Sequence, residues 1–161
     1  METCDDLRFD HGAETPERLK GQFARLAGMT ATQAQRLSRE ALRAAHAHKD
    51  HFVVLATLAE LGPASQATLS GRTRIYKSDL VAVLNDLEEG GWARRTPDPT
   101  DKRRNVISIT TAGEHRLAEL DHVLDGVNEQ IMTPLDRDER AQLLHLLGRV
   151  NAHLAGSAGG A

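Results

Sequence analysis

Apolar residues recur every three or four positions along most of the chain, which is the spacing of one face of an α-helix. Near the N-terminus, Thr15-Pro16-Glu17 is typical of a helix start, because threonine caps well and proline fits the first turn. The apolar positions of this helix are Leu19, Phe23, Leu26 and Met29. We expect the helix to break at Gly28 or Thr30 and to resume through Ala47.

The middle of the chain predicts further helices joined by turns. The first carries Phe52, Leu55, Leu58 and Leu61 on one face and ends at Gly62-Pro63. Ser65 can cap a short helix that turns Leu69 inward, and another helix begins near Tyr76 to Ser78. Its apolar stripe is Leu80, Val83, Leu84 and Leu87. The two helices that follow Gly62-Pro63 are typical of a helix-turn-helix, whose second helix enters a DNA major groove.

Residues 92–110 predict a β-hairpin with a basic tip. Arg94 and Arg95 lead into the turn Pro97-Asp98-Pro99, and the β-branched Val106, Ile107 and Ile109 form the return strand. The tip itself is Asp101-Lys102-Arg103-Arg104. A helix-turn-helix followed by such a two-stranded wing is a winged-helix module.

The last third predicts two long amphipathic helices. Thr111-Ala-Gly-Glu114 has the pattern of a capping box, and Asp136 to Glu139 opens the second helix in the same way. The apolar positions are Leu117, Leu120, Leu124, Val127 and Ile131 in the first helix and Leu143, Leu144, Leu147, Val150 and Leu154 in the second. Because no further domain covers these faces, they favour association with a second copy, with a closed monomeric bundle as the alternative.

The predicted fold class is mainly α with a small β-wing, in which a winged helix-turn-helix lobe is joined to a helical dimerisation arm from both termini. The sequence divides into a flexible N-terminus (1–14), an N-terminal helical part of the arm (15–48), a DNA-binding lobe (49–113), a C-terminal helical dimerisation region (114–155) and a flexible tail (156–161).

Composition narrows the class of protein. The net charge is −3, yet the segment from Arg72 to Arg104 holds eight Lys/Arg against six Asp/Glu, as expected for a small nucleic-acid footprint. The single Cys4 excludes an internal disulfide, and no apolar run approaches the roughly 18 residues of a membrane span. We therefore expect a cytoplasmic protein with no membrane partner. The sequence shows neither a nucleophile with an oriented base nor a closed metal site, and so predicts no enzyme, no cofactor and no metal.

The stretch from Phe52 to Gly113 resembles the MarR (multiple-antibiotic-resistance regulator) family of bacterial transcription factors. The matching pieces are Leu58-Ala-Glu-Leu-Gly-Pro63, the Ser78 to Glu88 helix, Gly91-Trp-Ala-Arg-Arg95, Asp98-Pro-Thr-Asp-Lys-Arg-Arg104 and Ile107-Ser-Ile-Thr-Thr-Ala-Gly113. The wing is the specific part, since the family wing reads Asp-x-x-Asp-Arg-Arg before Val-x-Leu-Thr-x-x-Gly. The resemblance implies an obligate homodimer on palindromic double-stranded DNA, with wings in minor grooves and recognition helices in the major groove.

The wing is the first region to which the resemblance assigns DNA contacts. Arg103 matches the second basic position of the family motif and is the expected minor-groove residue. Lys102 and Arg104 are expected at phosphates, and Asp101 is expected to orient a neighbouring arginine. Arg94 and Arg95 are expected at the wing base, unless one of them pairs with Asp86 or Glu88.

The recognition helix is the second region. Its expected DNA-facing residues are Arg74, Lys77, Ser78, Asp79 and Ala82, supported by Gln66 and Thr68 on the preceding helix, for which a solvated surface role is the alternative. The chain departs from the family pattern at Ala82 and Asp86, where arginine is common, and at Arg74, where the turn usually has glycine.

The resemblance also implies a small-molecule effector. Family members commonly bind aromatic or phenolic acids between the arm and the winged lobe, which releases DNA and makes the protein a repressor. The residues expected nearest that cleft are Arg25, His46, His48, His51 and Trp92, although a packing role is favoured for Trp92.

Three alternatives stay open. The spacing His46-x-His48-x-x-His51 is compatible with a metal-responsive regulator but lacks a fourth ligand. Cys4 is compatible with a redox-responsive regulator, although its acidic neighbours disfavour the reactive thiolate. Asp79 and Asp86 reduce the charge of the recognition helix, which is compatible with a winged-helix module that contacts protein.

Overall fold

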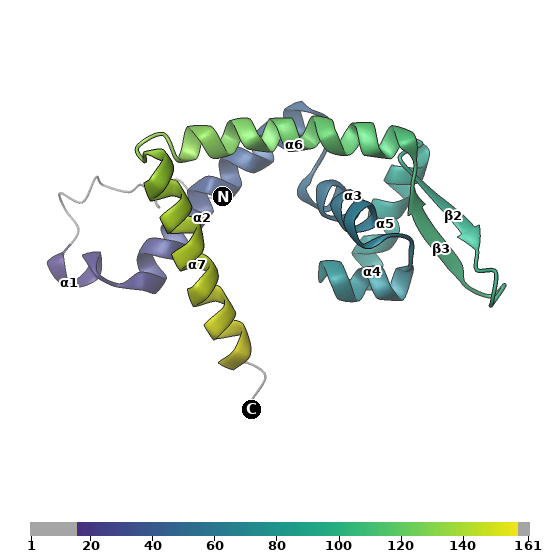
Figure 1. The fold of residues 1–161 in the computed structure, drawn as a ribbon, viewed down its shortest axis with the longest axis horizontal. Coiled ribbons are helices and arrows are strands. Elements are labelled where there is room, and N and C mark those ends of the chain that lie inside the picture. Colours follow the sequence, from purple (N-terminus) through teal and green to yellow (C-terminus); the bar gives the residue numbers. More distant parts are fainter. Residues whose placement is uncertain (1–15, 158–161) are drawn as a thin grey trace, which may run out of the picture. The chain divides into compact units, whose positions relative to one another are not determined.

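The computed structural model describes residues 16–157, shown in Figure 1. Its elements are α1 (Glu17–Lys20), α2 (Phe23–Ala44), α3 (Lys49–Leu61), β1 (Ala64–Ser65), α4 (Gln66–Thr73), α5 (Lys77–Glu89), β2 (Ala93–Pro97), β3 (Asn105–Ile109), α6 (Thr111–Ile131) and α7 (Arg137–Ser157). A mainly helical chain with one small antiparallel sheet confirms the predicted fold class. The chain divides into two compact units, one ending at Leu124 and one starting at Asp125. No helix in residues 16–157 is long and apolar enough to cross a bilayer.

The N-terminal helical part breaks earlier than predicted. α1 ends at Lys20 with Gly21 as its C-cap, and α2 then runs without interruption to Ala44. The expected break at Gly28 or Thr30 is therefore wrong. A glycine inside a helix costs only about 1 kcal/mol, and the Thr30 hydroxyl fits because it donates to the Leu26 carbonyl at 2.9 Å. The predicted cap, Thr15, lies outside the described residues.

The core of the first unit is aliphatic. Its largest fully buried side chains lie on α3, α4, α5, β3 and α6: Val54, Leu55, Leu58, Leu69, Leu80, Leu84, Leu87, Ile107 and Leu120. Most of these are the inner-face positions that the helical periodicity predicts. Burial of each leucine or isoleucine stabilises the fold by roughly 1.5–3 kcal/mol, so the helix-turn-helix is held by its own interior.

Individual glycine and polar residues end and begin the helices of the helix-turn-helix. Gly62, at φ 77°, ends α3 in a conformation that glycine adopts without strain. The Ser65 hydroxyl then accepts a hydrogen bond from the Thr68 backbone N–H at 3.2 Å and caps α4, as predicted. Arg74 ends α4 in the left-handed region, at φ 57° and ψ 22°. A side chain there costs about 1–2 kcal/mol relative to the right-handed conformation.

The wing is part of a three-stranded antiparallel sheet in the order β1-β3-β2. β2 and β3 pair from Ala93 with Ile109 to Pro97 with Asn105, as the hairpin prediction requires. β1 pairs with the other edge of β3, with Ala64 opposite Ile107. The sequence analysis missed β1 because two residues are too short to show alternation.

The start of α6 is tied to the base of the wing. The Thr110 hydroxyl accepts from the Gly113 backbone N–H at 3.0 Å and donates to the Gly91 carbonyl at 2.7 Å. The Thr110 N–H donates to the Trp92 carbonyl at 3.1 Å. The capping residue is thus Thr110, so the predicted capping box from Thr111 is wrong by one position. The C-terminal helical region accordingly begins at Thr111 rather than at 114.

The second unit contains the end of α6 and all of α7. The predicted capping box is confirmed, because the Glu139 N–H donates to Asp136 Oδ1 and the Asp136 N–H donates to Glu139 Oε2, both at 2.9 Å. α7 extends to Ser157, so the first two residues of the predicted flexible tail are helical. Large apolar side chains of α7 are 38–59% exposed in the single chain: Leu143, Leu144, Leu146, Leu147, Val150 and Leu154.

Candidate nucleic-acid interface

The wing tip is shaped by its two aspartates. Asp98 Oδ1 accepts hydrogen bonds from the Thr100 backbone N–H at 2.8 Å and the Thr100 hydroxyl at 2.7 Å. The backbone N–H of Thr100, and then its hydroxyl, lower the pKa of Asp98 below its ordinary value. Asp101 Oδ1 accepts from the Arg103 backbone N–H at 3.1 Å. Both carboxylates therefore accept hydrogen bonds within the turn, and Asp101 also pairs with one neighbouring cation, Arg104.

The basic side chains of the tip are exposed as a consequence. Lys102 and Arg103 make no side-chain hydrogen bond or ion pair with any residue that the structure describes. Arg104 Nε lies 3.5 Å from Asp101 Oδ2, so Arg104 is the arginine beside Asp101, and its side chain is 73% exposed. Such cations are available to phosphates or to a narrow minor groove.

Arg95 has a different role from the tip residues. Its Nη1 lies 2.6 Å from Glu88 Oε2 and 3.0 Å from Asn85 Oδ1, and its backbone N–H donates to Glu88 Oε1 at 3.1 Å. This pairing with Glu88 is one of the two that the sequence analysis left open. Arg95 therefore joins β2 to α5, whereas Arg94 on the same strand is exposed.

The beginning of α5 presents an exposed polar surface. Lys77, Ser78, Asp79 and Ala82 are all exposed, and the Ser78 hydroxyl donates to Asp79 Oδ1 at 3.2 Å. An open hollow of about 600 Å³ lies beside them, lined by Ser70, Gly71, Arg74, Ile75, Tyr76, Lys77 and Ser78. The predicted recognition-helix residues Arg74, Lys77 and Ser78 thus share one surface.

Tyr76 on this surface was not predicted as a site residue. It is the N-cap of α5 without a side-chain capping bond, and it is 80% exposed. A large amphipathic ring so exposed beside Arg74 and Lys77 is suited to contact a sugar-phosphate backbone. In the sequence, Tyr76 is marked only by its position just before the apolar stripe of α5. A tyrosine at such a position can equally be part of the core, so the sequence alone did not identify it as a site residue.

The supporting residues lie at the start of α4. Thr68 Oγ1 lies 2.9 Å from Ser65 Oγ, within the cap of the helix, and is exposed. Gln66 is half-buried. Both lie at the helix N-terminus, where backbone N–H groups favour an anion.

Trp92 is a packing residue in this structure. Its ring is half-buried against the core, and the Arg116 guanidinium carbon lies 4.9 Å from the ring centre. Arg116 also donates to the Ala45 carbonyl at the end of α2. The ring therefore joins the base of the wing to α6, as the packing interpretation predicts.

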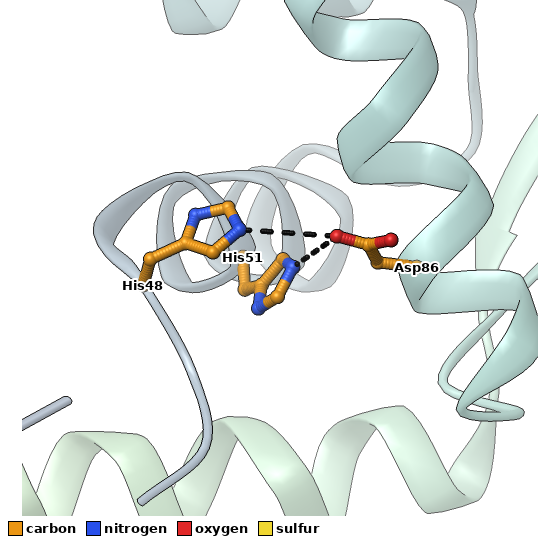
Figure 2. A group of neighbouring side chains, drawn as sticks. All are labelled: His48, His51 and Asp86. Carbon is orange, nitrogen blue, oxygen red and sulfur yellow. Dashed lines mark hydrogen bonds and ion pairs between the residues drawn. The ribbon is translucent and has the colours of Figure 1, made fainter. Parts of the chain in front are cut away.

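Two of the predicted pocket residues, His48 and His51, are in direct contact. Their ring centres are 3.7 Å apart, and Figure 2 shows that both rings face Asp86 of α5. His51 Nε2 lies 3.2 Å and His48 Nε2 lies 3.9 Å from Asp86 Oδ2. Arg25 lies on α2, and His46 lies in the connection after α2 at φ 53°. The third member of the group is Asp86, and His46 is not part of it.

His51 is the buried member of the group. Its side chain is 9% exposed, against 50% for His48 and 54% for Asp86. Burial, followed by repulsion from His48, lowers the pKa of His51 despite the nearby Asp86 carboxylate. Its Nδ1 is buried and has no hydrogen-bond partner among the described residues. Asp86 is thus the one group shown to orient the ring within the described part of the chain.

Comparisons with known proteins agree with this geometry. A family model described as the MarR family matches residues 48–104. The HTH-type transcriptional repressor NicR of Pseudomonas putida is 28% identical over 99 residues, which are 62% of this chain and 63% of NicR. The HTH-type transcriptional regulator PecS of Dickeya dadantii is 35% identical over 109 residues, 64% of each chain. The chain thus spans slightly less than two thirds of the length of these relatives.

A solved structure extends the match beyond the lobe. The apo form of wild-type MarR from E. coli superposes with a TM-score of 0.72 at 25% identity, covering 80% of this chain and 96% of MarR. Together these matches support a winged-helix regulator of the MarR family. This similarity agrees with the prediction of a transcriptional regulator rather than an enzyme.

Within the lobe that resembles the MarR family, the structure separates the predicted residues into two groups. Lys102, Arg103 and Arg104 are exposed at the wing tip, and the residues at the start of α5 are exposed around the hollow. Arg95 and Trp92 instead make contacts within the lobe. Cys4 lies outside the described residues.

Proposed function

We propose that this MarR-family protein is a homodimeric repressor that binds a palindromic operator and is released from it by a small aromatic or phenolic acid. The observation that carries the DNA-binding part is the wing tip. Its aspartates accept hydrogen bonds within the turn and pair only with Arg104, so Lys102 and Arg103 are exposed with no side-chain partner among the described residues. The exposed start of α5 belongs to the same compact unit.

The dimeric part is supported by α7. Six large apolar side chains on this helix are 38–59% exposed in the single chain, and a contiguous apolar face of this kind is unfavourable in water unless a partner covers it. Two copies would bring two wings and two recognition helices to one operator, which a palindromic sequence requires.

The test of DNA binding is a titration of the purified chain against DNA from upstream of its own gene at several salt concentrations. We expect tight binding at one palindrome with two protomers per site. Affinity should fall steeply with salt, because each phosphate contact contributes about −0.9 to the slope of log K against log salt. Arg103→Ala is expected to lower affinity markedly, since one good arginine contact contributes about 1–3 kcal/mol.

Arg39→Ala is the matched control, because Arg39 is exposed on α2 and carries the same charge. If both substitutions lower operator affinity equally, Arg103 contributes only its positive charge and makes no specific contact with DNA. Binding that is insensitive to salt and to DNA length would instead favour a protein partner. That second function is supported by the exposed Asp79 at the start of α5.

The dimer is tested separately by Leu144→Glu, because Leu144 is 59% exposed on α7. We expect light scattering to show a monomer and the operator titration to show a large loss of affinity. Gln142→Glu introduces the same charge two residues away on the same helix and should remain dimeric. A dimer in both variants would contradict association through α7. Effectors are then sought among aromatic acids by loss of the operator complex.

A further inference from the structure

His48, His51 and Asp86 form a compact group whose ligand atoms all lie within 4.8 Å of one another. The residues come from two elements of the first unit, since His48 and His51 are at the start of α3 and Asp86 is on α5 (Figure 2). Bonds of 2.0–2.2 Å to a tetrahedral zinc ion place neighbouring ligand atoms about 3.4 Å apart. The observed separations from Asp86 Oδ2, 3.2 and 3.9 Å, bracket that value.

An ordinary hydrogen-bonded pair accounts for only part of this arrangement. His51 Nε2 is within hydrogen-bond distance of Asp86, but His48 Nε2 at 3.9 Å is too far away. His48 is also the N-cap of α3, where a side chain normally accepts a helix N–H, yet it makes no capping bond. Its ring lies instead beside His51 and turns toward the carboxylate.

We propose that His48, His51 and Asp86 bind a divalent transition-metal ion of the zinc class through two imidazole Nε2 atoms and one carboxylate oxygen. Two nitrogens and one oxygen suit zinc and its neighbours rather than calcium or magnesium, which prefer oxygen ligands. Three protein ligands leave a fourth position for water or a small anion. A small rotation of the half-exposed His48 ring would complete the geometry.

The position of Asp86 gives the metal a regulatory role, and this part rests on the proposed DNA-binding function. Asp86 lies on α5, the proposed recognition helix, whereas both histidines lie at the start of α3. A bound ion would therefore fix α5 against α3 at that point. Metal occupancy would change operator affinity through the position of the recognition helix.

The test is zinc binding by the untagged full-length chain after removal of metals. Zinc alone is the probe, measured by calorimetry and by competition with a chromophoric chelator, with cobalt absorption spectra to report tetrahedral nitrogen and oxygen ligation. We expect one zinc ion per chain and a rise in the melting temperature when zinc is added.

The informative variants avoid the buried ring, whose loss could unfold the lobe. His48→Ala and Asp86→Asn alter exposed side chains and should each weaken zinc binding at least tenfold. His122→Ala and Asp121→Asn change exposed residues of α6 and serve as matched controls with unchanged affinity. Cys4→Ser removes the one thiol in the sequence and should also leave zinc affinity unchanged. Absence of stoichiometric zinc binding, or full binding by His48→Ala, would overturn the site.

Operator titrations with and without zinc separate the site from its regulatory role. A zinc-dependent change in affinity that disappears in His48→Ala supports both. If the chain binds zinc through these residues but its operator affinity does not change with zinc, only the regulatory role is overturned. If the chain binds zinc but no DNA, the proposed function is contradicted and the metal site is still supported.

Discussion

Gly113 stands where the start of α6 meets the base of the wing, and its substitution by alanine tests how the lobe is assembled. A methyl group at this position would overlap the carbonyl oxygen of Trp92 and lie 2.7 Å from Ile109 Cγ1. The Trp92 carbonyl belongs to the backbone and already accepts a hydrogen bond from the Thr110 N–H. It cannot rotate away as a flexible side chain would, so α6 must shift from the wing.

The size of the effect follows from the contacts that such a shift breaks. Three hydrogen bonds hold this junction: Thr110 N–H to Trp92, the Thr110 hydroxyl to Gly91, and Gly113 N–H to the Thr110 hydroxyl. At about 1 kcal/mol each, their loss lowers the free energy of unfolding by about 3 kcal/mol. The better helix propensity of alanine returns only about 0.5–1 kcal/mol. We therefore expect Gly113→Ala to lower the free energy of unfolding by about 2–2.5 kcal/mol in total.

The assay is urea unfolding followed by circular dichroism, with all variants at one protein concentration because the proposed dimer makes stability depend on concentration. Gly126→Ala is the control, since Gly126 is on the same helix and a methyl group there meets no atom within 4 Å. It should raise the free energy of unfolding by about 0.5–1 kcal/mol. If both variants shift stability in the same direction and by similar amounts, the proposed clash with the Trp92 carbonyl is wrong.

Three further predictions concern the DNA-binding lobe. Arg74→Gly should raise the free energy of unfolding by about 1 kcal/mol, because φ 57° suits glycine, and should lower operator affinity in the same titrations. Arg95→Ala should lower the free energy of unfolding by about 1 kcal/mol through loss of its half-buried pair with Glu88; a stability equal to that of the unchanged chain would contradict a structural role. The pKa of Asp98 is lowered, so as the pH falls its carboxylate stays ionised past its ordinary pKa and keeps its hydrogen bonds to Thr100. These bonds are lost only when the pH falls through the lowered pKa. The Thr100 amide resonance followed by NMR against pH should report this loss, and Asp98→Ala should abolish it.

The helical periodicity was sufficient to predict most of the lobe. The apolar stripe of α5 placed Leu80, Val83, Leu84 and Leu87 in the core, and all four are buried. The hairpin followed from the Pro97-Asp98-Pro99 turn and the β-branched return strand, and β2 and β3 do pair antiparallel on either side of that turn. These predictions succeed because burial of one face is a local property that the spacing of residues records directly.

The failures involve choices between adjacent residues or contacts across the fold. Thr110 and Thr111 are chemically identical candidates for the cap, and only the position of the Gly91 carbonyl selects Thr110. Asp86 is 35 residues from His51, so its place beside the histidines depends on how α5 packs against α3. The spacing of His46, His48 and His51 compares only residues that are close in the sequence, so it could not indicate Asp86.

Because β3 lies in the centre of the sheet, the strands of the wing stabilise the lobe, whereas the turn at its tip is left for contacts with DNA. β3 is paired on both edges, with β1 on one side and β2 on the other. Its buried Ile107 is opposite Ala64 of β1 and Arg95 of β2. The turn that connects β2 and β3 contributes no strand pairing beyond Pro97 and Asn105, and its own hydrogen bonds, such as that from the Asp98 N–H to the Arg104 carbonyl at 2.8 Å, stay within the turn. Changes of length or charge in that turn are therefore tolerated at small energetic cost, which leaves the wing tip open to acquire new operator preferences while the lobe keeps its stability.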